Sequence, residues 1–230
     1  MGSISVSADN HQPKLGADLR QLSPVFAVNK YRMSITFSNL SAVRDGMASL
    51  LDAFAQQVTR PRFLNLSLFA QDTWKASSRL TLTYGLRWEL NPPPHERDGN
   101  EALTLTGLDN PAAFAAAPRG TPLYRTSYTS FAPRFGVAYQ VTRGQGRELV
   151  LRGGVGKFYA LGSEAISRAY IGYPFTVTKS TSNASLPFTA TQLEPPPFPT
   201  TFAPPFPGFL YVYEPDIKLP ETWQWNVALE

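Results

Sequence analysis

The chain has 230 residues, a formal net charge of +4 and no cysteine, which excludes disulfides, thiolate catalysis and cysteine-bound metals. Its basic residues are scattered singly rather than in runs, so we expect no nucleic acid partner. Aromatic residues make up 13% and charged residues 17%, a combination that favours an aromatic-girdled membrane barrel or a carbohydrate-binding sandwich over an ordinary soluble domain.

The N-terminal part of the chain predicts two strands, at 3–9 and 13–22, separated by a polar turn near 10–12. Residues 31–38 also alternate between apolar and polar side chains, as a strand does. The period then changes, because the apolar residues of 45–57 recur at the spacing of one helical face. We therefore expect one short loop helix over 45–57, with Asp45 as its N-cap.

The clearest pattern is a hairpin formed by 62–75 and 79–90 around a tight turn at 76–78. In 79–90 every even position is leucine, tyrosine or tryptophan, and every odd position is polar, charged or glycine. The eleven residues 80–90 span about 36 Å, which is long for a soluble sheet and sufficient for a tilted strand to cross an outer membrane. The prolines at 92–94 then end the pairing, since proline cannot donate a ladder hydrogen bond.

A second hairpin is predicted from 131–142 and 147–159, around a tight turn at 143–146. A last alternating segment covers 222–230. Short turns thus alternate with long connections, which is the arrangement of outer-membrane barrels. The long connections, expected to be extracellular, are 23–61, 91–130 and 160–221.

These segments predict an all-β fold, an antiparallel meander of long transmembrane-type strands. If all the short turns lie on the periplasmic side, 22–61 must cross the membrane an even number of times. The segment 31–38 and the 45–57 helix therefore belong to one extracellular excursion, and seven wall strands remain. Because seven strands leave open edges, which lipid does not tolerate, we expect a fragment of a larger barrel, incomplete at both ends.

The hairpin SLFAQDTWKASSRLTLTYGLRWE at 67–89 resembles one of the TonB-dependent outer-membrane transporters, especially the Oar-like group. The segments KLGADLRQL, DGMASLLDAF, FAPRFGVAYQV, ELVLRGGVGKFY and TWQWNVALE resemble further pieces of this family in the same order. The resemblance implies a 22-stranded barrel in the outer membrane, a plug domain, and a TonB box that couples nutrient uptake to the proton-motive force. We recognise neither a plug nor a TonB box here, so we expect 1–230 to be a barrel portion that is not transport-competent alone.

Two sets of candidate functional residues follow from the strand pattern. Single charges on the polar faces predict a lumenal network of Arg87, Glu89, Arg134 and Arg152. Aromatic residues of the wall strands are candidates for contact with the membrane interfaces of the lipid bilayer. They are Trp74, Trp88, Tyr139, Tyr159, Trp223 and Trp225.

Catalysis has no support in the sequence. His95 follows three prolines in what the pattern predicts to be a solvated loop tip, and nothing brings Glu89 and Glu148 together. We expect no enzyme activity, cofactor or metal, and the sequence names no substrate. Two other architectures remain open, a soluble β-sandwich that binds a ligand such as carbohydrate and a small closed barrel in which 222–230 pairs with 3–9.

Overall fold

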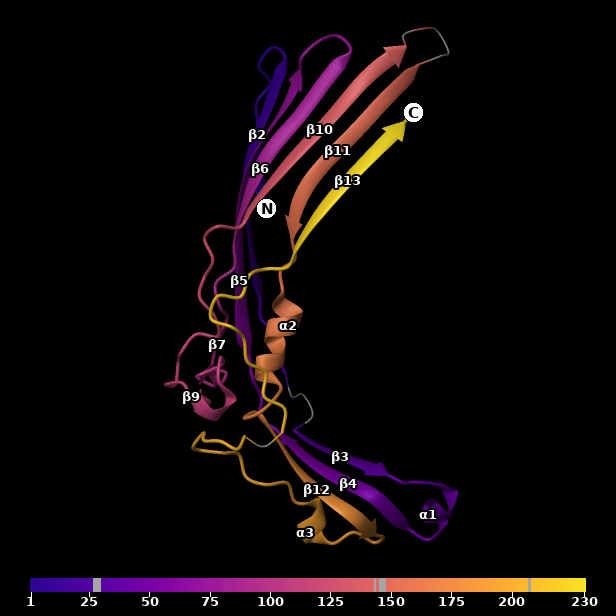
Figure 1. Ribbon diagram of the computed structural model, residues 1–230, viewed down its shortest axis with the longest axis vertical. Helices are drawn as coiled ribbons and strands as arrows, with labels where there is room; N and C mark the ends of the chain where they lie inside the picture. Colours follow the sequence, from indigo (N-terminus) through magenta and orange to yellow (C-terminus); the bar gives the residue numbers. More distant parts are fainter. Residues whose placement is uncertain (27–29, 143, 145–147, 207) are drawn as a thin grey trace.

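The computed structural model describes residues 1–26, 30–142, 144, 148–206 and 208–230, and it is dominated by antiparallel β-strands. One large sheet, the wall sheet, occupies one half of the elongated molecule (Figure 1). Its strands lie in the order in which they occur in the chain, and β7 (His95–Glu96) adds to the start of the third. The seven are β1 (Gly2–Ser5), β2 (His11–Leu22), β5 (Pro61–Lys75), β6 (Leu80–Leu90), β10 (Phe131–Thr142), β11 (Leu149–Tyr159) and β13 (Glu221–Leu229).

The seven wall strands predicted from sequence are confirmed as neighbours in one meander, although β1 is shorter than the predicted 3–9. The tight connection between β5 and β6 is present at 76–79, whereas 143–146 lies outside the described residues except for Gly144. Strands β1 and β13 form opposite ends of the strand order and are not paired with each other in the described ladders. The small closed barrel is therefore not the structure adopted.

Short and long connections leave the wall sheet at opposite ends. The connections β1–β2 and β5–β6 lie at one end with the C-terminus, and the long connections leave from the other (Figure 1). We call the described residues of 23–60, 91–130 and 160–220 the loop region. Strand β5 extends from the wall into the loop region, where β7 pairs with its first residues.

The two faces of the wall sheet differ in chemistry, because residues opposite each other across a ladder share a face. On one face, the apolar face, ladder rows such as Leu68–Trp88–Phe131 are continuous from strand to strand. The opposite, polar face carries rows such as Gln71–Gly85–Arg134. Many side chains of the apolar face are exposed, including Ile4, Leu15, Leu19, Leu68, Leu86, Phe135, Leu151, Val155, Trp225 and Leu229.

The predicted helix at 45–57 is wrong. Residues Met47–Gln56 form β4, the centre of a second sheet between β3 (Tyr31–Thr36) and β12 (Thr176–Ser185). The helix, α1 (Leu40–Arg44), precedes it and is capped by the side chain of Asn39. Asp45 is at its C-cap, and Gly46 follows with φ of +65°, a left-handed conformation that ends the helix.

Pairing on both edges of β4 explains this outcome, because two ladders satisfy the backbone groups that a helix would otherwise pair internally. The expectation that 31–38 lies outside the wall is confirmed, since β3 belongs to the second sheet. The expectation of one loop helix also falls short of the number of helices in the structure. Two further short α-helices are described, α2 (Ser163–Ser167) and α3 (Ala190–Leu193), along with 3-10 turns at Pro111–Ala113 and Arg168–Tyr170.

The buried hydrophobic clusters lie in the loop region or where β5 enters it. The largest surrounds Tyr170, which is 1% exposed and packs with Phe63 and Phe175. A second lies under β4 at Leu51, and a third surrounds Tyr173 near β8 (Leu105–Thr106) and β9 (Ala115–Ala116). Among the described residues, no helix is long and apolar enough to span a membrane.

Candidate functional site

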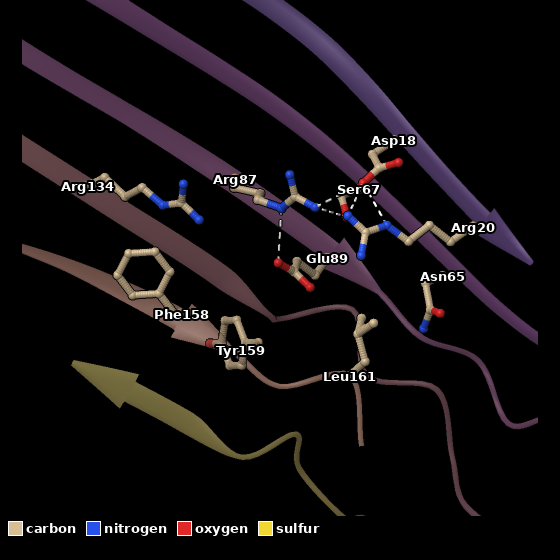
Figure 2. Close-up of a pocket in the computed structure, with 10 residues that line it drawn as sticks. All are labelled: Asp18, Arg20, Asn65, Ser67, Arg87, Glu89, Arg134, Phe158, Tyr159 and Leu161. Atoms are coloured by element: carbon tan, nitrogen blue, oxygen red, sulfur yellow. Dashed lines mark hydrogen bonds and ion pairs between the residues drawn. The ribbon is translucent and has the colours of Figure 1, made fainter. Parts of the chain in front are cut away.

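A charged pocket lies on the polar face of the wall sheet, at the end from which the long connections leave. Its volume is about 270 Å³, and side chains of β2, β5, β6, β10 and β11 converge on it (Figure 2). Polar side chains predominate in its lining. The residues are Asp18, Arg20, Asn65, Ser67, Arg87, Glu89, Arg134, Phe158, Tyr159 and Leu161.

Arg87 is the centre of the ion-pair network in this pocket. Its Nε donates to Glu89 Oε1 at 3.0 Å, and its Nη2 donates to Ser67 Oγ at 2.7 Å and lies 3.7 Å from Asp18 Oδ2. Arg20 Nη2 lies 3.0 Å from the same Asp18 oxygen. The side chains of Asp18 and Glu89 are 7% and 9% exposed, so both carboxylates depend on these arginines for compensation.

Arg134 lines the same pocket but forms no ion pair with another described residue. Its ladder neighbours are both glycine, Gly85 on β6 and Gly156 on β11. Its guanidinium carbon lies 4.4 Å from the ring centroid of Phe158, a cation–π contact. The two ladder neighbours of Arg134 thus present no side chain beside it, and the Phe158 ring lies against one side of the arginine (Figure 2). We call Gly85 and Gly156 the Gly85–Gly156 floor.

The four charges predicted to form a network are only partly brought together. Arg87 and Glu89 pair directly, and Arg134 lines the same pocket. Arg152 lies farther along β11, toward the short-turn end, and pairs with Glu230 at 2.9 Å. Asp18, Arg20 and Ser67 also line the pocket and were not among the residues predicted from sequence. Asp18 and Arg20 alternate with the apolar residues of 13–22, so the same period of two could have placed them on the polar face.

The candidate interface aromatics lie at different heights on the wall sheet. Trp74 is near the short-turn end, where its ring stacks on His11 with centroids 5.5 Å apart. Tyr139, opposite Leu80, lies at the same end. Two of the aromatics donate to backbone carbonyls, Trp88 Nε1 to that of Tyr128 and Tyr159 Oη to that of Phe131. Four of the six candidates lie farther toward the long connections. They are Trp88, Tyr159, Trp223 and Trp225.

A second polar cluster occurs on the apolar face near the short turns. Asp72 accepts from Tyr84 Oη at 2.9 Å and from the Gln12 backbone N–H at 3.1 Å. His11 Nδ1 lies 2.6 Å from Asp72 Oδ2. The carboxylate thus has three neighbours from β2 and β6, which makes it an internal cross-strand fastening.

Polar side chains in the loop region mainly fix the loop backbone. Glu96, 6% exposed, accepts backbone N–H groups from Arg60, Asp98 and Asn100 at 2.6–2.8 Å. His95 is exposed but lies in β7 rather than at a loop tip, so that expectation is wrong. Burial raises the pKa of Tyr124 to about 12, and its hydroxyl donates to the Pro92 carbonyl.

No group of three or more acidic, histidine or cysteine side chains suited to a metal ion occurs among the described residues.

Comparison with known proteins assigns the whole chain to a family. No curated protein and no solved structure gives a significant match. A family model described as an outer membrane beta barrel domain matches residues 1–230. The chain therefore belongs to the outer membrane beta barrel domain family and is located in the outer membrane.

Proposed function

We propose that the chain is the barrel portion of a TonB-dependent, Oar-like receptor that takes up a scarce nutrient across the outer membrane. One observation carries the proposal. The wall sheet has an exposed apolar face and a polar face, and the outer edges of β1 and β13 have no partner strand among the described residues, so further strands are needed to close it in lipid. A barrel with more strands has a lumen wide enough for a polar face and for a plug.

The glycines of the polar face support a filled lumen. Gly16, Gly85, Gly136, Gly154 and Gly156 all lie on that face. Three of them have a large ladder partner, because Gly16 is opposite Phe69, Gly85 is opposite Gln71 and Gly156 is opposite Arg134. A side chain added at Gly85 would come within 2.9 Å of the Ala70 carbonyl oxygen. Because glycine has no side chain, it allows another backbone to approach the wall sheet closely at these positions. In the proposed receptor that backbone belongs to a plug domain.

The folded loop region supports a receptor rather than a simple pore. Its three hydrophobic clusters and its second sheet give the long connections a defined shape above the wall. The aromatics at the two ends of the apolar face are assigned to the two membrane interfaces. The soluble sandwich is set aside, because the family is an outer-membrane one and the apolar face of the wall sheet is uncovered.

Growth under nutrient limitation tests energised uptake. The natural full-length protein is deleted in its own host, and growth is measured on a panel of limiting nutrients, alongside a strain that lacks TonB. We expect both strains to grow poorly on the same limiting nutrient. The double mutant should grow no more poorly on that nutrient than either single mutant. Uptake that needs this protein but continues without TonB would overturn the proposal and indicate a passive channel.

A further inference from the structure

The charges of the pocket on the polar face do not balance. Three guanidinium groups, those of Arg20, Arg87 and Arg134, face two carboxylates. Arg20, Arg87 and the Met1 ammonium group, which lies 3.9 Å away, share Asp18, and Arg87 also pairs with Glu89. Both carboxylates are therefore already paired without Arg134. The pocket therefore keeps positive charge in excess, and Arg134 is its arginine without a carboxylate partner among the described residues.

Arg134 is also placed to receive a ligand. It is exposed, and it borders the charged pocket and two neighbouring hollows, one toward Gly85 and one toward Gly154. In Figure 2 its guanidinium extends toward Arg87, on the side of the pocket opposite Asn65. A side chain at Gly156 would come within 3.2 Å of Arg134 Cγ, so the glycine keeps the floor beneath the arginine low.

The surroundings of Arg134 favour a planar anion. The ring of Phe158 covers one face of the guanidinium, and the ladder neighbours offer no side chain to bind its in-plane N–H donors. A carboxylate presents two oxygens in one plane and matches this fork of donors. The space of about 270 Å³ beside it accepts a small group rather than a large polyanion.

We propose that Arg134, with Phe158 behind it and the Gly85–Gly156 floor beneath it, is a carboxylate-binding site on the lumenal face of the barrel. The carboxylate comes either from a small molecule in the lumen or from an acidic side chain of a protein segment that fills it. The site rests on the wall sheet facing a lumen, and it does not require TonB-driven uptake.

Arginine modification tests the site in the natural full-length protein purified from outer membranes. The rate of phenylglyoxal modification is measured for Arg134 by peptide mass spectrometry in chloride, succinate or phosphate of equal ionic strength. Arg152, paired with Glu230 where both side chains are more than half exposed, is the reference. If the site is open to small molecules, we expect succinate to slow the modification of Arg134 about tenfold, because the bound carboxylate forms charge-assisted hydrogen bonds with it. Phosphate should slow the modification less.

If the protein itself supplies the carboxylate, phenylglyoxal modifies Arg134 slowly in chloride alone. Molar sodium chloride then increases the modification rate, because it screens the ion pair. Three results would overturn the proposal. One is a rate equal to that of Arg152 in all three anions. Another is slow modification that molar salt does not change, which indicates steric cover only. The third is protection by phosphate but not by succinate.

Thermal unfolding gives a second readout that does not depend on chemical modification. For an open site, succinate raises the melting temperature of the wild-type protein and of Arg152→Gln, but not that of Arg134→Gln. Arg134 has no carboxylate partner among the described residues, so its removal is not expected to prevent folding. Neither assay involves TonB or uptake, so a negative result here leaves the proposed function standing, and a failure of energised uptake leaves the site standing.

Discussion

In the wall sheet, large apolar side chains such as Trp225 and Leu229 are more than 60% exposed, whereas in the loop region Leu51 and Tyr170 are at most 1% exposed. Both regions contain antiparallel strands and large apolar side chains. They differ in the solvent that their apolar residues face. The wall sheet presents them outward to lipid, and the loop region buries them from water, as a soluble domain does.

The difference also changes what holds each region together. The wall strands are joined by backbone ladders and by cross-strand polar contacts such as Arg87–Ser67 and Asp72–Tyr84. In the loop region, side-chain packing around Tyr170 and Tyr173 joins segments that are distant in the chain. Substitutions that act on one region should therefore leave the other largely unaffected.

The largest effect is expected when a core of the loop region is emptied. Tyr170→Ala removes the centre of the largest cluster and a hydroxyl that donates to the Pro94 carbonyl. It should destabilise the loop region by about 3–5 kcal/mol. Limited proteolysis of the protein in bilayers should show cleavage within 91–130 and 160–220 while the wall strands stay protected. The control is Tyr128→Ala, an aromatic that is 65% exposed, and equal proteolysis of both variants would contradict the comparison.

A charge on the apolar face should damage the wall selectively. Leu86→Arg places a guanidinium on the exposed apolar face, where lipid cannot solvate it. We expect a loss of about 2–4 kcal/mol if the position lies near the bilayer midplane. The measurement is urea unfolding of the full-length protein in lipid vesicles. Thr83→Arg is the matched control, since Thr83 lies on the polar face of the same strand, and an equal loss in both would show that the faces are wrongly assigned.

Within the polar face, a paired and poorly exposed arginine should matter more than an exposed one. Arg87→Met leaves Asp18 and Glu89 without their shared partner, and should cost about 1–3 kcal/mol. Arg152→Met removes only an exposed pair with Glu230, for which about 0–1 kcal/mol is expected. Urea unfolding of both variants in vesicles decides the point. Similar losses would mean that the pocket network contributes no more than a surface ion pair.

The smallest effect is expected at alkaline pH in the loop region. Burial raises the pKa of Tyr124 to about 12 from the ordinary 10.0, so the folded state holds the phenol proton more tightly than the unfolded state does. The resulting stability is fully present below about pH 10 and is lost as pH rises through about 12. Tyr124→Phe should flatten this part of the profile in proteolysis assays, whereas Tyr128→Phe should not. An unchanged profile in Tyr124→Phe would refute the assignment.

The alternation of side chains determined most of the wall by itself. A strand exposes successive residues to opposite faces, so the period of two in 79–90 specified the strand, its apolar face and the positions of Arg87 and Glu89. The same logic holds for 131–142, whose predicted bounds are those of β10. The prolines at 92–94 likewise marked the end of β6, because they cannot take part in a ladder.

Tertiary structure decided what local pattern leaves ambiguous. The apolar spacing of 45–57 fits a helix, but β4 is a strand because β3 and β12 pair with both of its edges, and β12 lies more than 100 residues away in the chain. Similarly, Arg152 and Arg134 are both single charges at polar-face positions of an alternating strand. The ladder between β11 and β13 nevertheless places Arg152 near Glu230. The charge excess at Arg134 also depends on Asp18 and Arg20 arriving from β2, since only the register of the sheet determines which charges meet.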